Sequence, residues 1–324
     1  MSIIEPTFTI GNVAIHGDLI LSPMVGYSDV PYRLICRRMG AAMSYTSSIL
    51  DEATLYGSNH TNQLLRFLPE ERPMAIQLLS NNADTLVEAA QRVMELEPDL
   101  IDLNLGCPAR HVTRRGRGSA LLLDPPLIGQ MVSRLVQAVP VPVTAKIRLG
   151  WDEQTRNHLE VARILEDSGI AAIAVHGRTR EQGYGGQADW QAIAEVREAV
   201  RVPVLANGDV RAPEDIAAIK RATGCQGVLI GRGAVGNPWI FARRDAASVS
   251  HEQRLAMIRH HLEMMLAYYG EQNGLVLFRK HLIKYVQGWP DAALLRRRLM
   301  TSETPDALLW TLSSWVARPL ANAS

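Results

Sequence analysis

The chain has 324 residues, of which 47% are hydrophobic, 6% aromatic and 21% charged. This composition is typical of a globular enzyme and excludes a disordered chain, and the length accommodates one barrel of about 240 residues with a smaller domain. No apolar run reaches the roughly 20 residues that span a bilayer, and residues 1–17 lack the pattern of a secretory signal. We therefore expect a cytoplasmic protein with no membrane partner.

The three cysteines, Cys36, Cys107 and Cys225, are too few and too scattered for a disulfide framework or a zinc cluster, so no metal is expected. The formal net charge of +1 hides two basic regions. Residues 109–118 contain four arginines and no acid, and residues 251–300 contain eight Lys or Arg against four Asp or Glu. Together they predict a surface for a polyanion, although a solvated helix face also explains the second region.

Taken in chain order, residues 8–15 predict a hairpin that turns at Gly11 and Asn12 and precedes the main sheet as a plug. Eight short apolar runs follow, which is the number of strands in a (β/α)₈ TIM barrel. These runs are residues 19–24, 42–47, 74–79, 100–105, 143–148, 171–176, 202–207 and 227–231.

Helical patterns with recognisable caps separate most of these runs, as in residues 82–96, 124–139 and 155–168. Such alternation favours a parallel sheet, and eight strands favour its closure. A doubly wound open sheet is the alternative, which the lack of Gly-x-Gly-x-x-Gly after the first strand disfavours. From residue 252 onward the pattern predicts a helical bundle, so we expect a barrel domain at 1–244 and a helical domain at 245–324.

The predicted strands end in polar or close-packing residues. Catalytic groups of a barrel gather at the C-terminal ends of its strands. A lone Lys or His at such a position is more often a satisfied core group, but a full set in register indicates a site. The set comprises Pro23, Met24, Gln77, Asn104, Lys146, Arg148, His176, Asn207, Gly208, Asp209, Gly231 and Arg232.

Glycines after the last two strands allow backbone N–H groups to approach a phosphate, and Arg232 adds a charge-assisted bond. Lys146, at the end of the fifth strand, places a cation where an electron-accepting ring gathers negative charge. Flavin mononucleotide (FMN) fits this pattern. A phosphorylated sugar fits it as well.

Eight segments carry a family resemblance: LSPMVGYSDVPYR, IQLL, DLNLGCPARHVTRRGRGSALL, TAKIRLGW, AVHGRTR, VLANGD, GVLIGRGAVGNPWIF and FRKHLIKYVQG. Over about residues 19–300 the chain resembles the tRNA-dihydrouridine synthases, in particular the bacterial B-type group. The Asn-x-Gly-Cys-Pro core, followed by Gly-x-Gly-Ser-Ala-Leu-Leu, is highly specific to that family.

The resemblance implies an FMN enzyme that reduces the 5,6 double bond of a uridine in tRNA, with NADPH reloading the flavin. No internal repeat, coiled coil or exposed apolar motif indicates an obligate protein partner. By position, Asn104 and Arg148 hold the uracil and Cys107 is the proton donor. The resemblance also implies the residues that bind the cofactor: Pro23, Met24, Val25, Gln77, Lys146, His176, Asn207, Gly208, Asp209, Gly231 and Arg232.

The chemistry explains the choice of a cysteine. Hydride added at C6 of uracil leaves negative charge on C5 and the C4 carbonyl, so an acid must protonate C5 from the other face. An ordinary thiol, with a pKa of about 8.5, is mostly protonated at neutral pH and is acidic enough to donate. We therefore expect Cys107 to act as an acid rather than a nucleophile, and Cys36 and Cys225 to be buried structural thiols.

Two groups of basic residues are expected to contact tRNA. In the loop after Cys107 these are Arg114 and Arg115, together with Arg110 and Arg117, and the alternative is a solvated loop. In the helical domain the resemblance implies phosphate contacts by Arg279, Lys280, Lys284, Arg296, Arg297 and Arg298, and internal salt bridges are the alternative there.

Two other functions remain open at this stage. An FMN barrel oxidoreductase of a small molecule, such as a dihydroorotate dehydrogenase, leaves the basic helical region without a role. A catalytically idle RNA-binding protein is disfavoured by the presence of Cys107, Lys146 and His176.

Overall fold

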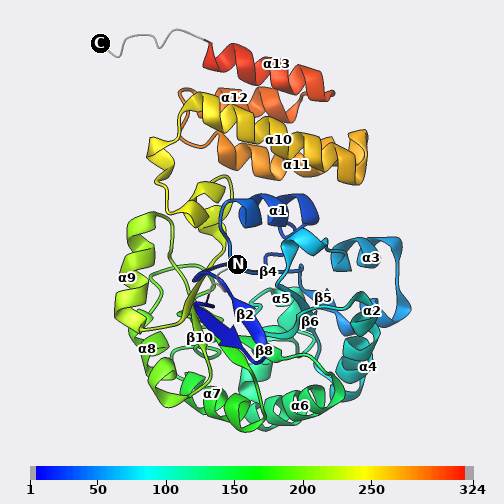
Figure 1. Cartoon of the computed structure of the whole chain (residues 1–324), viewed down its shortest axis with the longest axis vertical. Helices are drawn as coiled ribbons and strands as arrows, with labels where there is room; N and C mark the ends of the chain where they lie inside the picture. The colour runs from blue at the N-terminus through cyan, green and yellow to red at the C-terminus, as the bar shows by residue number, and fades with distance from the viewer. Residues whose placement is uncertain (1–4, 318–324) are drawn as a thin grey trace.

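A closed parallel barrel forms the larger part of the computed structural model, which describes residues 5–317 (Figure 1). Its strands follow one another around the barrel in chain order, and β3 closes it by pairing with β11 on one side and, through a parallel bridge from Ile20 to Met43, with the β4 segment on the other. The barrel is confirmed and the open sheet is excluded. Its strands are β3 Leu19–Leu21, β4 Ser44–Tyr45, β6 Met74–Leu79, β7 Leu100–Leu105, β8 Val143–Arg148, β9 Ala172–His176, β10 Val204–Asn207 and β11 Gly227–Ile230, and β5 Ile49–Leu50 pairs with β6.

The predicted hairpin is confirmed and plugs the barrel. Strands β1 Phe8–Ile10 and β2 Val13–Ile15 pair antiparallel, and Gly11 adopts the positive φ of +57° that the turn requires. Ile10 and Ile15 are fully buried in an apolar cluster with Ala75 and Leu100, which lie near the N-terminal ends of their strands. The hairpin therefore covers the end of the barrel opposite the strand ends that carry polar residues.

Helices surround the barrel, with the caps that the sequence predicts. Asn82 accepts hydrogen bonds from the backbone of Asp84 and Thr85, and Asp124 caps a helix whose first residue is a proline. The helices of this part are α1 Val30–Arg38, α2 Asp51–Tyr56, α3 Asn59–Leu65, α4 Ala83–Val93, α5 Arg110–Thr113, α6 Pro125–Ala138, α7 His158–Asp167, α8 Trp190–Ala199 and α9 Pro213–Thr223.

One helix begins later than predicted. Helix α7 starts at His158 rather than Thr155, because Thr155 is held in a turn by Asp152, whose carboxylate accepts from the Thr155 backbone N–H and hydroxyl at 2.8 Å each. Gly150 then bridges antiparallel to Arg156. Local side-chain bonds of this kind compete with the helix for the same backbone groups.

The C-terminal helices build a second apolar core beside the barrel. They are α10 His251–Tyr269, α11 Glu271–Tyr285, α12 Ala292–Met300 and α13 Pro305–Val316. Their core includes Leu262, Phe278 and Leu312, and also Trp239 from the short helical turn Pro238–Ala242. The predicted boundary at 244/245 stays a proposal, since Trp239 packs with the bundle although it precedes that boundary, and the two predicted domains extend into residues 1–4 and 318–324, outside the described part.

Helix α1 connects the two cores, and Figure 1 shows it between the barrel and the bundle. Met39 at its C-terminal end packs against both apolar clusters. On the barrel side, the buried guanidinium of Arg33 donates from Nε to Glu71 Oε2 at 2.5 Å and from Nη1 to the Ser28 carbonyl at 2.6 Å. These bonds fix α1 to the segment that leads into β6.

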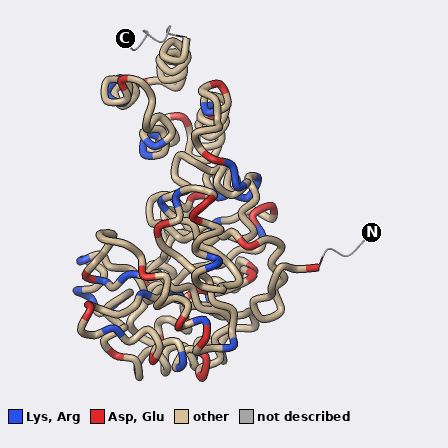
Figure 2. Tube along the Cα trace, turned by 90° about the vertical axis from the view of Figure 1, so that its left-hand side faces the viewer, with Lys and Arg blue, Asp and Glu red and all other residues tan. Residues whose placement is uncertain are grey.

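Charges of both signs are interspersed over the barrel, and several basic segments lie on the C-terminal helices (Figure 2). Within residues 5–317, no helix has the length and apolar character needed to cross a membrane.

The buried ion pair on α1 generates a stability prediction. We expect Arg33→Met to lower the free energy of unfolding by about 3–5 kcal/mol, because the Glu71 carboxylate then stays buried without its cation. The double variant Arg33→Met/Glu71→Met should recover part of this loss. Urea unfolding measures both effects, and a single variant as stable as the wild type would contradict the prediction.

Candidate active site

Strand register brings the predicted site residues together at one end of the barrel. Asn104 on β7 pairs with Lys146 on β8, while Arg148 on β8 pairs with His176 on β9, which in turn pairs with Asn207 on β10. Because these strands are parallel, their C-terminal ends open onto one mouth. The predicted gathering of polar strand ends is confirmed, and the ligand expected for each residue stays a prediction.

Asn207 on β10 holds the Lys146 side chain in a fixed position. Its Nζ donates to Asn207 Oδ1 at 2.9 Å, and Asn207 Nδ2 donates to the Leu229 carbonyl at 2.9 Å. Burial lowers the pKa of Lys146 to about 8, and the nearby Arg148 guanidinium acts in the same direction. The side chain is therefore predominantly an ammonium at neutral pH.

A chain of hydrogen bonds links three strands below the mouth. Asn104 Nδ2 donates to Gln77 Oε1 at 2.9 Å, Gln77 Nε2 donates to Asp102 Oδ2 at 2.7 Å, and Thr144 Oγ1 donates to Asp102 Oδ1 at 2.5 Å. Burial raises the pKa of Asp102 to about 6, although these donors and Lys146 act against the shift. The sequence did not predict a role for Asp102. The one available signal was its position as an acidic residue inside an apolar strand.

The loop after β7 places Cys107 at the mouth. Asn104 Oδ1 accepts from the backbone N–H of Gly106 at 3.1 Å and of Cys107 at 2.9 Å, which closes a tight turn. The Cys107 carbonyl accepts from Ser119 Oγ at 2.8 Å. Gly118 has a φ of +61°, and a Cβ there would lie 2.9 Å from the Cys107 oxygen. The loop thus needs glycine at this position, and it leaves Cys107 partly exposed.

Arg148 is buried and anchors two loops. Its Nε donates to the Gly106 carbonyl and its Nη1 donates to the carbonyls of Thr179 and Gly183, each at 2.8 Å. Burial lowers the pKa of Arg148 to about 10, so the guanidinium keeps its charge. Arg148 therefore fixes the loop of Cys107 relative to the loop after β9, besides any contact with a ligand.

A second buried arginine, which sequence reasoning did not single out, holds Asp209. Arg178 Nη2 donates to both carboxylate oxygens of Asp209 at 2.8 and 2.7 Å, and its Nη1 lies 3.4 Å from His176 Nε2. Burial works to raise the pKa of Asp209, but the bonds from Arg178 and from the Ala188 N–H outweigh it and keep the pKa below its usual value. Burial, followed by the charge of Lys146, holds the pKa of His176 well below its usual value, so this imidazole is neutral.

The glycines after the last two strands differ in the room that they leave for a side chain. At Gly208, with a φ of +132°, a Cβ would lie 2.6 Å from the Ala188 Cβ, and at Gly231 it would lie 3.5 Å from Met24 Sδ. Gly208 therefore requires glycine, whereas Gly231 lies in ordinary contact with the loop after β3. After Gly231 the chain forms only the short helical turn Arg232–Ala234.

Tyr184 is a further residue of the mouth that sequence reasoning missed. Its ring is 57% exposed, with the Arg232 guanidinium 4.2 Å and the Arg148 guanidinium 5.5 Å from its centroid. The His176 ring lies 6.3 Å away. The available signal was a single aromatic residue in a glycine-rich loop directly after a predicted strand.

The loop after β3 lies beside that of β11. The Met24 N–H donates to Ser28 Oγ at 2.8 Å, and the Met24 carbonyl accepts from the Ser28 N–H, so the loop is a closed turn. Pro23 and Met24 are partly buried, whereas Val25 is 71% exposed. Pro23, Met24 and Val25 therefore form an apolar border of the polar mouth, at the strand end where the family resemblance predicts the flavin ring.

The arginine loop divides into two kinds of residue. Arg110, Arg114 and Arg115 are exposed. Arg117 is buried, and its Nη2 lies 2.7 Å from Glu52 Oε1, so the expectation that it reaches RNA with the others is wrong. The reason is that α2 supplies acids to the base of the loop, which no local pattern reveals.

The basic residues of the bundle divide similarly. Arg279 is partly buried and donates from Nη2 to the Ser302 carbonyl at 2.9 Å, and Lys280 extends over the ring of Tyr27, 5.8 Å from its centroid. Lys284 and residues 296–298 are exposed. Because Lys284 and residues 296–298 are exposed, they are available to a polyanion.

The cysteines Cys36 and Cys225 are both buried, as expected.

The closed barrel, with a thiol, two arginines and a lysine at its mouth, defines a (β/α)₈ enzyme. A sequence model of the family "Dihydrouridine synthase (Dus)" matches residues 20–318. The chain is 40% identical over 308 residues to a tRNA-dihydrouridine synthase B from Xanthomonas axonopodis pv. citri, covering 93% of each protein, and 39% identical to one from Pseudomonas aeruginosa, covering 92% of each. The chain belongs to the dihydrouridine synthase family.

Solved structures show the same fold at low identity. An old yellow enzyme homologue from Zymomonas mobilis superposes with a TM-score of 0.53 at 13% identity, covering 73% of this chain and 90% of that one. A 2-naphthoyl-CoA reductase gives a TM-score of 0.58 at 10% identity, covering 72% of this chain and 51% of that one. The family model, in contrast, also covers the helical bundle. A barrel oxidoreductase that acts on a small molecule gives this bundle no role.

The raised pKa of Asp102 generates a prediction about pH. A carboxyl group with a folded pKa of about 6 and an unfolded pKa of about 3.9 binds more protons in the native state, so this site loses stability as the pH rises from about 4 to 6. Relative to Asp102→Asn, the wild type should lose about 2 kcal/mol of unfolding free energy over that range.

Urea unfolding at several pH values measures this difference. Asp306→Asn, at an exposed position on α13, is the control and should follow the wild type. Parallel curves for the wild type and Asp102→Asn would refute a raised pKa at Asp102.

Proposed function

We propose that this protein reduces the 5,6 double bond of uridine in tRNA to dihydrouridine, with FMN as cofactor and NADPH as reductant. The observation that carries the proposal is the adjoining placement of Lys146, Asn104 and Cys107 at the mouth of the barrel, in a chain that belongs to the dihydrouridine synthase family. The relatives named tRNA-dihydrouridine synthase B support tRNA as the substrate.

The residues of the mouth fit a flavin phosphate. Gly208 and Gly231 keep the chain free of side chains after the last two strands, and Arg232 supplies positive charge there. Asp209 is already neutralised by Arg178, so we infer that it acts by bracing Arg178 and offers the ligand its backbone. Pro23, Met24 and Val25 supply the apolar wall against which a ring would pack, and Asn207 holds Lys146.

Bound FMN would deliver a hydride to C6 of the uracil after being reloaded by NADPH. Lys146 is the fixed cation of the site, and Gln77 presents an amide whose orientation is set by Asp102. His176 is neutral and offers a ring nitrogen without adding charge. These residues bind and orient the cofactor, and their electrostatic effect is strong because they are buried.

Cys107 is the proposed proton donor to C5. Asn104 holds the Cys107 backbone through its side-chain oxygen, and Arg148 holds the neighbouring Gly106 carbonyl. Asn104 and Arg148 therefore position the Cys107 thiol, and both also border the place where the uracil would bind. Arg148 uses Nε and Nη1 for these anchors, so we infer that contact with a uracil oxygen falls to Nη2.

The tRNA surface is proposed to combine the exposed arginines beside Cys107 with the exposed basic residues of the bundle, Lys284 and residues 296–298. A uridine must leave its stack to reach the mouth, and phosphate contacts on both sides would hold the flanking strand while it does so. Arg279 and Lys280 remain candidates, but their partial burial favours a supporting role. A cytoplasmic location without an obligate protein partner accords with this function.

The acid is tested by Cys107→Ala. We expect FMN content and NADPH oxidation close to the wild type, with dihydrouridine formation in unmodified tRNA reduced at least about 100-fold, because a positioned acid contributes roughly that much. Cys225→Ala removes a buried thiol beside β11 and should retain activity. Mass spectrometry of digested tRNA measures the product, and turnover by Cys107→Ala at the wild-type rate would refute the assignment.

The arginine loop is tested by Arg114→Ala/Arg115→Ala. Each lost phosphate contact should lower the slope of log affinity against log salt by about 0.7–0.9 and weaken tRNA binding. Arg221→Ala, an exposed arginine on α9, should leave both unchanged. Binding measured over a series of salt concentrations decides the matter, and a slope equal to that of the wild type would exclude the loop from the RNA surface.

A further inference from the structure

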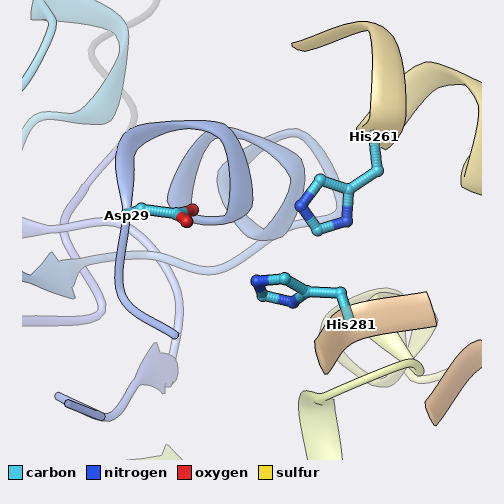
Figure 3. A group of neighbouring side chains, drawn as sticks. All are labelled: Asp29, His261 and His281. Carbon is cyan, nitrogen blue, oxygen red and sulfur yellow. The ribbon is translucent and has the colours of Figure 1, made fainter. Parts of the chain in front are cut away.

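Three buried polar side chains meet where the barrel joins the bundle. Asp29 is the N-cap residue of α1, His261 lies on α10 and His281 lies on α11. Figure 3 shows the carboxylate and the two imidazoles pointing toward a common space between the three helices. One potential ligand atom from each residue lies within 4.8 Å of the other two. Neither the barrel site nor the proposed RNA surface includes these residues.

The atoms that face this space have no hydrogen-bond partner in the described structure. Asp29 Oδ2, His261 Nε2 and both ring nitrogens of His281 are buried and unpaired. The exposed fractions of the three residues are 8%, 0% and 0%, so water does not satisfy them from outside. Buried polar groups are paired in nearly all native structures, and several unpaired ones in one cluster indicate a missing partner.

The second polar atoms of Asp29 and His261 have the hydrogen-bond partners that metal-binding side chains commonly have. Asp29 Oδ1 accepts from the Tyr32 N–H at 3.1 Å, which leaves Oδ2 as the free oxygen. His261 Nδ1 lies 3.2 Å from the Tyr285 hydroxyl, which leaves Nε2. A ligating imidazole commonly engages a hydrogen-bond partner through its second nitrogen, which fixes the ring.

Aromatic packing orients the two imidazoles without satisfying their nitrogens. The His281 ring lies 4.5 Å from that of His261, 5.0 Å from Tyr32 and 5.2 Å from Tyr27, measured between centroids. Burial lowers the pKa of His261 to about 3 and that of His281 well below its usual value. Both rings are therefore neutral, which is the form that binds a metal.

The charges around the cluster are few. Tyr269 lies near the Asp29 carboxylate, and the half-buried Lys280 ammonium acts on the same carboxylate from α11. Lys280 opposes a bound cation, whereas the carboxylate of Asp29 favours it. Two neutral imidazoles and one carboxylate are a donor set that suits zinc, and burial away from the barrel mouth indicates a structural ion.

We propose that Asp29, His261 and His281 bind one zinc ion that joins α1 of the barrel to α10 and α11 of the bundle. Zinc ligands lie about 2.0–2.2 Å from the metal, so binding draws the three side chains together from their present separation, and a water completes the tetrahedron. The sequence predicts no metal because its three cysteines are scattered, whereas this set is dispersed over residues 29–281 and is not visible as a local pattern.

The test uses the full chain with its flavin and without an affinity tag. Wild-type protein is incubated with zinc chloride, desalted and measured by elemental mass spectrometry, together with His261→Gln, His281→Gln and the exposed neighbour His260→Gln. We expect about one zinc per chain in the wild type and in His260→Gln, and less than about a tenth of that in the two cluster variants. FMN content is measured alongside, so a failure of this site is distinguished from a failure of the flavin site.

A second measurement does not depend on the variants folding. Cobalt(II) added to metal-free wild-type protein should give the visible absorption of a tetrahedral site, at wavelengths beyond the flavin bands, and zinc should displace it. Wild-type protein that retains no zinc and gives no such absorption would overturn the proposal. Equal zinc in the wild type and both cluster variants would also overturn it.

Discussion

The parallel register of the strands from β6 to β10 decides which side chains meet at the barrel mouth. Because Asn104 pairs with Lys146 and Arg148 pairs with His176, a shift of one strand by a single residue would turn its functional side chain away from the others. The hairpin plug and the apolar side chains between the strands hold this register from the opposite end. The site is thus a consequence of how the core packs.

Register alone leaves an excess of positive charge at the mouth. Lys146, Arg148 and Arg178 are enclosed there, and Asp209 is the carboxylate that Arg178 engages directly. With a pKa of about 6, Asp102 is predominantly a carboxylate at neutral pH, so Asp102 and Asp209 offset two of these three cations. Neutral His176 adds none. The three enclosed cations outnumber the two carboxylates, and an anionic ligand stabilises such an excess, which supports the proposed phosphate and electron-accepting ring.

The sequence predicted the barrel, the hairpin and most strand limits because period-two and helical patterns are local properties. It predicted the residues at strand ends for the same reason, since each follows an apolar run. It did not predict Arg178, Tyr184 or the burial of Arg117, whose partners lie on other loops. Asp102 was missed because a buried carboxylate in a strand depends on donors from neighbouring strands, and linear spacing does not reveal them.

Helix α1 makes the barrel mouth and the bundle depend on each other. Its N-cap Asp29 comes directly after Ser28, whose hydroxyl accepts from the Met24 N–H and whose carbonyl accepts from Arg33. A movement of the bundle that displaces Asp29 is therefore transmitted through one residue to the loop that borders the proposed flavin ring. If the bundle contacts the tRNA backbone while the barrel holds the flavin and the uracil, as proposed, catalysis needs a fixed distance between the two parts. Binding of the proposed zinc ion by Asp29, His261 and His281 would fix that distance, because it joins α1 directly to α10 and α11.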